Sequence, residues 1–343
     1  MQGNTIFADL DEHLKKTLYL FDLPGLAVHA GIDGCDYYSA AGWQNAITKT
    51  PLLQHHVFHM ASVTKLFVGT AILMLGERGL LNIDEKVIKY LPEFHMADEK
   101  YRQITLRHLL THTSGMADVK NYNWDKPETD DGALMRYVLS PEVTDSLLLW
   151  EPGQSRFAYS NMGYEVLGAV IAAVSGQSFE DYVTENIFVP LGMADTDLLT
   201  FRRDMSNVCA PHEKDADNHF SLIRDFPYNR AHSPSSTLTS TLSDMALWSK
   251  AVLDKKILAP ESLEEAFKVH AIVPNNGEGI CLSWFRREQN GHVLYGHEGD
   301  DDGFRASFWI CPELRVSITV CTNMSRAPVK RINREVFDII SRQ

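Results

Sequence analysis

The sequence has little of what marks several common classes of protein. It holds five cysteines in 343 residues, far apart and odd in number, so neither a CxxC metal site nor a full disulfide framework is indicated. No apolar run approaches the ~18 residues that a membrane-spanning helix needs. Basic runs are missing, and 32 basic against 45 acidic residues give a net charge of −13. These features argue against nucleic acid or an anionic membrane as principal partner and favour small molecules or short peptides.

The N-terminal segment also lacks the basic start and apolar core of a secretory signal peptide. We therefore expect a cytoplasmic location, with the cysteines as reduced and mostly buried thiols. No internal repeat, low-complexity tract or Pro/Gly/Ser-rich linker divides the chain, so two domains, if present, are expected to be interwoven. A GxSxG elbow and a GxGxxG loop are missing as well, which leaves the α/β-hydrolase and dinucleotide-binding classes without support.

What the sequence does contain is apolar material for a large core, since 44% of its residues are hydrophobic. The spacing predicts a helix over residues 6–21. A hairpin is predicted around Asp33-Gly34, because Asp-Gly between two apolar runs favours a tight turn. From Ser62 to Gly79 apolar residues cover every helix face, which predicts a helix buried on nearly all sides.

The predicted secondary structure changes from helices to strands after the middle of the chain. Helical patterns dominate residues 80–258, whereas residues 279–323 form short alternating or apolar runs that predict consecutive antiparallel strands. A helix over 328–340 closes the chain. We expect a mixed α/β fold in which an antiparallel sheet flanked by helices is interrupted by a large, mostly helical insertion. The predicted domains are a discontinuous α/β sandwich, residues 1–79 and 259–343, and a helical domain, residues 80–258.

Lys65 stands where helix physics disfavours a cation. The first amides of a helix are unpaired donors, so a lysine in the first turn costs about 0.3–1 kcal/mol. Ser62 precedes it by three residues and shares its helix face. Burial and the helix field favour loss of the lysine proton, and a neutral amine beside a hydroxyl is a base beside a nucleophile. The alternative, commoner for an isolated SxxK, is an N-cap serine followed by a lysine that reaches solvent.

A second segment carries a tyrosine and an asparagine at a predicted loop-to-helix junction. There the phenol of Tyr159 can enter a cleft, and a helix N-terminus or a nearby lysine can favour its phenolate form. The amide of Asn161 can bond both Lys65 and a substrate carbonyl. The plainer interpretations are a turn tyrosine and an N-cap asparagine.

A third segment follows in the predicted sheet. A strand is predicted to end at Tyr295-Gly296, with His297-Glu298-Gly299 on or beside its edge. Glycine there lets a substrate backbone approach, and the amide after Gly299 is a candidate oxyanion donor. Taken alone, the segment is typical of a hairpin loop.

The set SxxK, YxN and HxG, in this order, resembles the serine β-lactamase and penicillin-binding protein superfamily, on its class C β-lactamase, D-peptidase and esterase side. The segments ITLRHLLTHTSGM and WEPGQSRFAYSNMGYEVLGAVI are similar to the same family, and the resemblance spans much of the chain from Ala61 to Asn323. It implies a β-lactamase/transpeptidase-like fold with the active site at the interface of the two predicted domains. It calls for no metal and no cofactor.

The resemblance also implies a role for each motif residue. Ser62 would be the acylated nucleophile, with Lys65 and Tyr159 as the proton-transfer pair. The implied substrate-binding residues are Asn161, which would orient the substrate amide and Lys65, His297 and Gly299 at the sheet edge, and Asp300, whose backbone N–H would form an oxyanion hole with that of Ser62.

The chain departs from the family pattern at the third motif, where typical β-lactamases have Lys-Thr-Gly. Histidine is largely neutral near pH 7 and Glu298 adds negative charge, so a carboxylate-bearing substrate loses an anchor. HxG motifs resemble those of D-aminopeptidases and family esterases. We therefore predict a serine hydrolase that acts on a small ester, amide or peptide through an acyl-serine intermediate. The alternatives are a true β-lactamase or D-Ala-D-Ala carboxypeptidase, an acyltransferase, and a non-catalytic binding relative.

Two other features have weaker functional interpretations. Residues 300–302 are three aspartates, predicted to form a solvated turn; alternatively, one of them faces the pocket and pairs with a substrate amine. Two histidine groups have helical, metal-like spacing but no identifiable carboxylate partner, so no metal site is predicted at His55, His56 and His59 or at His108 and His112.

Overall fold

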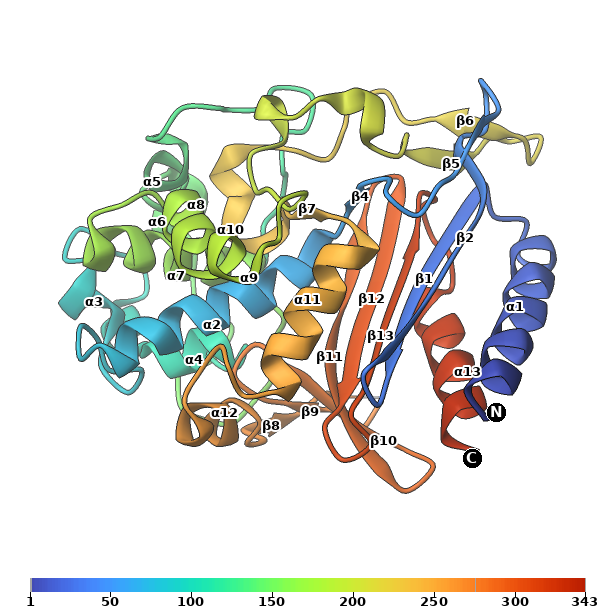
Figure 1. Ribbon diagram of the computed structural model, residues 1–343. Coiled ribbons are helices and arrows are strands. Elements are labelled where there is room, and N and C mark those ends of the chain that lie inside the picture. Colours follow the sequence, from blue (N-terminus) through green and yellow to red (C-terminus); the bar gives the residue numbers. More distant parts are fainter. Residues whose placement is uncertain (1, 275, 343) are drawn as a thin grey trace.

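The computed structural model describes residues 2–274 and 276–342, and an antiparallel sheet organises them. The sheet has nine strands in the order β3-β2-β1-β13-β12-β11-β10-β9-β8. Helices lie on both of its faces, and the two chain ends lie near each other on one side (Figure 1). The expected class, an antiparallel sheet flanked by helices, is confirmed. The strands are β1 (Gly25–Ile32), β2 (Cys35–Asn45), β3 (Thr50–Pro51), β8 (Ala271–Ile272), β9 (Gly279–Ile280), β10 (Phe285–Gln289), β11 (His292–Asp301), β12 (Phe304–Cys311) and β13 (Val316–Thr322).

Tight turns set the register of this sheet, and one of them is the hairpin predicted at Asp33-Gly34. Asp33 and Gly34 join β1 to β2 with φ of 46° and 84°, which is the geometry that Asp-Gly supplies in a two-residue hairpin. Asn290 and Gly291 do the same between β10 and β11, with φ of 53° and 80°. The run of antiparallel strands after residue 279 is therefore confirmed.

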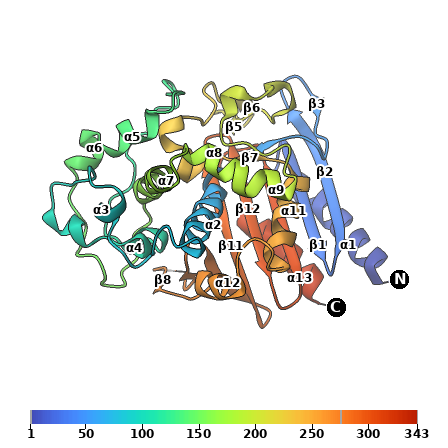
Figure 2. The same cartoon turned by 60° about the vertical axis from the view of Figure 1, so that its left-hand side comes forward.

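Two hydrophobic cores lie on opposite faces of the sheet. On one face α1 (Gln2–Leu20) and α13 (Val329–Ser341) pack against the strands and each other, with Leu10, Trp309 and Phe337 buried between them. The larger core lies on the other face, where α2 (Thr64–Glu77) runs between the sheet and several of the other helices (Figure 2). Eleven of the residues in α2 are buried, as its uninterrupted apolar pattern predicted.

The regular structure of segment 80–258 is mainly helical, and its helices contribute to the larger core (Figures 1 and 2). One of its helices, α11 (Leu242–Leu253), packs on β1 and β13 and so covers the sheet itself. The division into two domains stays a prediction, and α11 shares in the sheet packing. The other helices are α3 (Val87–Tyr90), α4 (Leu106–Leu110), α5 (Ala133–Val138), α6 (Pro141–Thr144), α7 (Asn161–Ser175), α8 (Phe179–Val183), α9 (Val189–Leu191), α10 (Ser233–Ser236) and α12 (Pro260–Ala266), with short strand pairs β4 (Phe58–His59) with β7 (Thr239–Ser240) and β5 (His212–Lys214) with β6 (Phe220–Leu222).

Cysteine placement agrees with reduced thiols. All five are free, four are buried, and Cys35 is exposed at the start of β2. Among the described residues, no helix has both the length and the apolar content to cross a membrane.

Candidate active site

Ser62 lies in a single 3₁₀ turn, Ala61–Val63, that leads directly into α2. Lys65 follows in the first turn of the helix, and its Nζ lies 2.9 Å from Ser62 Oγ. The predicted contact between the two side chains is therefore confirmed. Ala61 has a φ of 47°, a conformation that costs free energy for a residue with a Cβ, so the backbone is strained next to Ser62.

The amine of Lys65 is enclosed by protein. Lys65 is fully buried, and its Nζ donates a second hydrogen bond of 2.7 Å to the carbonyl oxygen of Ser235. Burial lowers the pKa of Lys65 to about 8, against the opposing pull of nearby carboxylates such as Glu165 and Asp118. At that pKa about a tenth of the molecules carry a neutral lysine at pH 7, far more than for a lysine in water.

Tyr159 also contacts Ser62. It lies two residues before Asn161, the first residue of α7, and its hydroxyl donates to Ser62 Oγ over 3.0 Å. The ring stacks on His112 at 4.3 Å between centroids. Burial raises the pKa of Tyr159 well above its usual value. The expected phenolate is therefore wrong: the same burial that makes Lys65 easier to deprotonate keeps the phenol protonated.

Asn161 opens α7 but does not make both of its predicted contacts. Its Nδ2 donates to Asp118 Oδ1 over 3.0 Å, and its backbone N–H donates to the same oxygen over 2.8 Å. Among the described residues the hydrogen bonds of Lys65 go to Ser62 and Ser235, so the expected bond between Asn161 and Lys65 is not formed. Asn161 does line the cavity in front of Ser62.

The third motif lies inside a strand, so the predicted strand end at Tyr295-Gly296 is wrong. Strand β11 continues to Asp301, because its pairing with β12 runs on to the pair Asp301 and Phe304. Its pairing with β10 stops at Gly296. From His297 onward β11 therefore pairs only with β12, and its other edge borders the cavity. The motif thus lies at a strand edge, as predicted.

Gly299 brings this edge against the turn that carries Ser62. A Cβ at Gly299 would lie 2.2 Å from the carbonyl oxygen of Met60, a distance that no side chain tolerates. The close approach places the backbone after Gly299 beside the segment that leads into Ser62. This is the arrangement that an oxyanion hole of the Ser62 and Asp300 amides needs, and that role stays a prediction.

His297 is 2% exposed and sits beside Tyr159, with 6.2 Å between ring centroids. Its Nδ1 lies 2.6 Å from the carbonyl oxygen of Glu298. Since a carbonyl only accepts, Nδ1 carries the proton and Nε2 keeps a free lone pair. Burial, and then the charge of Lys65, lower the pKa of His297 to about 3. The histidine is therefore neutral and does not replace the lysine of a Lys-Thr-Gly motif.

The three aspartates after Gly299 do not form one solvated turn. Asp302 and Gly303 make the turn between β11 and β12, whereas Asp300 and Asp301 belong to β11. The side chain of Asp300 is 72% exposed and pairs with Arg305. That of Asp301 is 11% exposed, and its Oδ2 lies 2.8 Å from His59 Nε2 and also accepts from Ser236. The turn interpretation is correct for Asp302, while Asp301 lines the cavity.

A cavity of about 400 Å³ connects these groups. Its lining includes Ser62, His297 and Glu298 of β11, Trp309 of β12 and Lys330 of α13. Its walls include Tyr122, Phe157 and Phe285, so apolar surface surrounds the polar centre. This volume suits a small molecule or a short peptide.

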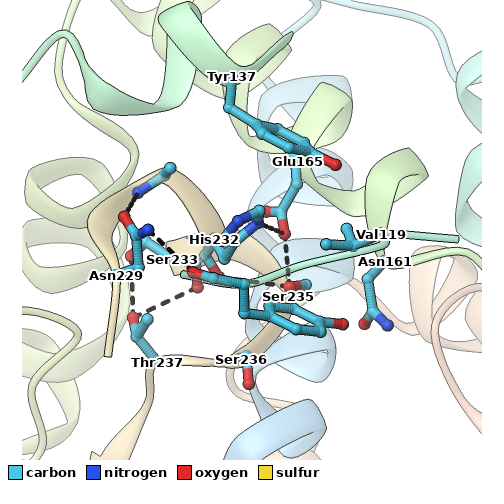
Figure 3. A network of polar contacts seen from close by, with 12 residues as sticks. Val119, Tyr137, Asn161, Glu165, Asn229, His232, Ser233, Ser235, Ser236 and Thr237 are labelled. Carbon is cyan, nitrogen blue, oxygen red and sulfur yellow. Dashed lines mark hydrogen bonds and ion pairs between the residues drawn. The ribbon is translucent and has the colours of Figure 1, made fainter. Parts of the chain in front are cut away.

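One group that supports Lys65 through Ser235, the carboxylate of Glu165, was not among the predicted site residues. Glu165, fully buried on α7, accepts a 2.5 Å hydrogen bond from Ser235 Oγ and lies 3.2 Å from His232 Nδ1. Figure 3 shows the carboxylate pointing at both side chains. A Cβ at Gly168 would lie 2.1 Å from Pro234, so α10 packs directly on α7. A glutamate inside the apolar run YEVLGAVIAAV was the signal that could have revealed this network.

The two histidine groups have structural roles. His59 bonds Asp301, His112 stacks on Tyr159, and His108 takes part in the cap of α4. His56 accepts from the backbone of Leu53. Within the part of the chain that the structure describes, no three His, Cys, Asp or Glu side chains are placed to hold a metal ion.

Comparison with known protein families identifies the family of this chain. The family model described as Beta-lactamase matches residues 11–339, which is nearly the whole chain. The chain belongs to the Beta-lactamase family. Penicillin-binding protein 4* of Bacillus subtilis is 28% identical over 71% of this chain and 55% of its own length. Protein flp of Staphylococcus aureus is 25% identical over 94% of this chain and 64% of its own length. The chain thus spans between half and two thirds of these relatives.

Two solved structures share the fold. The octameric penicillin-binding protein homologue from Pyrococcus abyssi superposes with a TM-score of 0.87 at 24% identity, covering 97% of this chain and 77% of that one. D-amino acid amidase from Ochrobactrum anthropi, complexed with L-phenylalanine amide, superposes with a TM-score of 0.81 at 22% identity, covering 99% and 98%. The fold expected from the SxxK, YxN and HxG motifs is therefore confirmed.

Proposed function

We propose that this protein is a serine hydrolase that cleaves a small ester, amide or peptide through an acyl-Ser62 intermediate. The observation that carries the proposal is the pair of hydrogen bonds on Ser62 Oγ, one shared with the buried amine of Lys65 and one donated by Tyr159. A serine held this way has a base and a fixed donor within hydrogen-bond distance of the same oxygen. The nearby cavity gives a substrate access to it.

In the proposed acylation step, neutral Lys65 takes the hydroxyl proton of Ser62 as Oγ attacks the substrate carbonyl. The bond from Oγ to the carbonyl carbon forms, and the bond to the leaving group breaks. Lys65 then passes the proton to the departing oxygen or nitrogen and becomes neutral again. Tyr159 keeps its own proton, because burial raises its pKa, and holds Oγ in position.

In the proposed deacylation step, water takes the place of Ser62 as the nucleophile. Neutral Lys65 takes a proton from the attacking water and returns it to Ser62 Oγ as the acid product leaves. The backbone N–H groups of Ser62 and Asp300 would bind the oxyanion in both steps. Asn161, held by Asp118, faces the same cavity and would orient the substrate amide. No step needs a metal or a cofactor.

The similarity in fold to a D-amino acid amidase supports an amide substrate. The third motif argues against the antibiotic or D-Ala-D-Ala alternative, because neutral His297 and acidic Glu298 offer a carboxylate no cation. An acyltransferase would share the acyl-enzyme and differ in the acceptor. A non-catalytic relative would have no need to keep Lys65 buried against Ser62.

A substrate panel tests the proposal. Short-chain aryl esters, D-amino-acid amides and penicillins should be assayed with the wild type and with Ser62→Ala. We expect turnover of at least one ester or amide that Ser62→Ala loses by about 10³-fold or more. The variant should keep the wild-type circular dichroism spectrum. Turnover that survives in folded Ser62→Ala would overturn the proposal.

A further inference from the structure

A buried carboxylate that the proposed steps do not use lies close to the proposed base. Glu165 is fully buried on α7, and Lys65 is fully buried in the first turn of α2. The two helices pack against each other. An enclosed charge is costly unless other groups compensate it, so the contacts of Glu165 indicate what it does.

The contacts of Glu165 form a chain that ends at Lys65. Ser235 donates from Oγ to Glu165 Oε1 over 2.5 Å, and its backbone carbonyl accepts from Lys65 Nζ over 2.7 Å. His232 Nδ1 lies 3.2 Å from the same carboxylate oxygen. His232 directly precedes α10 and Ser235 lies within it, so one carboxylate holds this short helix at two points (Figure 3).

These contacts suit an ionised carboxylate. Glu165 Oε1 accepts the hydrogen bond from Ser235, and Oε2 has no hydrogen-bond partner among the described residues, so a carboxylic O–H there would lack an acceptor. Burial raises the pKa of Glu165, and the hydrogen bond with His232 opposes that rise. In the described part of the chain no direct ion pair joins Glu165 to Lys65. The carboxylate therefore acts on the amine through Ser235 and through space.

Several other titratable groups also face the amine of Lys65. They are Asp118 and His112 from the segment after α4, Tyr159 and Tyr164 from the start of α7, and His297 and Asp301 from β11. Burial lowers the pKa of Lys65, and among the carboxylates Glu165 opposes this most. Glu165 is also the carboxylate that is bonded to the residue holding the amine.

We propose that Glu165 is a positioning residue for Lys65, which fixes the amine on Ser62 through Ser235 and favours its protonated form by charge. This inference deepens the proposed hydrolase function and rests on it. In the proposed acylation step Lys65 becomes positively charged as it takes the serine proton, and a fixed negative charge nearby stabilises that state. The same charge lowers the fraction of neutral Lys65 in the free enzyme.

The pH profile separates this role from a purely structural one. Glu165→Gln keeps an acceptor for Ser235 and removes the charge. Because a nearby carboxylate raises the pKa of a lysine, its removal should lower the midpoint of the kcat/KM profile on a neutral aryl ester by about half a pH unit. Below the wild-type midpoint the variant should therefore keep a larger share of its plateau activity than the wild type. A variant that only loosened the fold would lose activity at every pH and keep the midpoint.

Ser235→Ala tests the positioning. It keeps the backbone carbonyl that accepts from Lys65 and removes the hydroxyl that connects this segment to Glu165. We expect the plateau of kcat/KM to fall by about fivefold or more, because the amine is held less firmly on the serine. Glu180→Gln is the control, since Glu180 is also a buried carboxylate but lies on α8 and bonds Arg230. This control should keep the wild-type midpoint.

Circular dichroism first establishes that each variant folds. A folded Glu165→Gln variant whose midpoint lies within about 0.2 pH unit of the wild type, or above it, would overturn the proposal. A Ser235→Ala plateau within about twofold of the wild type would also overturn it, whether or not Glu165→Gln folds.

Ser62→Ala is measured with the same ester. If Ser62→Ala abolishes the turnover, the proposed hydrolase function would still stand when the inference about Glu165 fails. Turnover independent of Ser62 would instead overturn that function, so the two failures are distinct.

Discussion

The amine of Lys65 lies 2.9 Å from the hydroxyl oxygen of Ser62, in the first helical turn, where a cation is disfavoured. The placement is explained by burial, which lowers the pKa of the amine to about 8 and makes the neutral form accessible. A second bond to Ser235 fixes the amine, and the network of Glu165 and His232 fixes Ser235 in turn. The position of Lys65 thus slightly lowers the stability of the helix and places a base beside Ser62.

Lys65→Met should lower the acylation rate by about 10³-fold or more, because it removes the base and keeps a similar buried volume. The measurement is the single-turnover rate of acyl-enzyme formation with an aryl ester. Lys250→Met, an exchange on α11 outside the described lining of the cavity, is the control and should keep the wild-type rate. A Lys65→Met variant within tenfold of wild type would contradict the role of base.

Tyr159→Phe should be less damaging, with a loss on the order of 10–10²-fold, since the phenol stays protonated and positions Ser62 without carrying the proton. Rates for both single variants and for Lys65→Met/Tyr159→Phe should be compared. We expect the double variant to lose little beyond Lys65→Met, because both residues act on the same oxygen. Fully multiplicative losses would argue against a shared network.

Activity should rise with pH. Lys65 must be neutral to accept a proton, so kcat/KM should be low below its pKa of about 8 and level off above it. Between about pH 5 and pH 9 neither His297, with its lowered pKa, nor Tyr159, with its raised pKa, should add an inflection. A profile of kcat/KM on a neutral aryl ester checks this. A midpoint near the ordinary value for histidine, or a fall toward alkaline pH, would disagree with Lys65 as the base.

Short-chain aryl esters should be better substrates than a chromogenic cephalosporin. His297 and Glu298 stand where typical β-lactamases hold the carboxylate of the antibiotic with Lys-Thr-Gly, and neither donates a hydrogen bond or a positive charge there. The test is kcat/KM for both substrates at one pH. A clear preference for the cephalosporin would favour the antibiotic alternative.

The sequence predicted most of the architecture because local signals agreed with the tertiary packing. The Asp33-Gly34 hairpin, the apolar helix after Ser62 and the alternating strands beyond residue 279 each formed as expected. The strand β11 was cut short in the prediction because Gly296 and Gly299 are typical of loops. In the structure they are the positions where β12 and the segment before Ser62 approach the backbone.

The contacts around Ser62 were likewise predictable where they are local in sequence and not where they join distant segments. A spacing of three residues was sufficient to place Lys65 beside Ser62, since one helix turn fixes both. The partners that come from distant segments, Ser235 behind Lys65 and Asp118 beside Asn161, depend on how helices pack and left no local pattern. The protonation state of Tyr159 could not be predicted from the sequence either, because it depends on the burial of the side chain, which is a tertiary property.

The most direct test of the central claim is the covalent state of Ser62 during turnover. The enzyme should be mixed with an activated ester, quenched in acid within the first turnovers, and digested for peptide mass spectrometry. We expect the acyl group on the peptide that contains Ser62, and no adduct in Ser62→Ala under the same conditions. Hydrolysis of the ester with no acyl group on Ser62, or with the label on another residue, would contradict the acyl-serine mechanism.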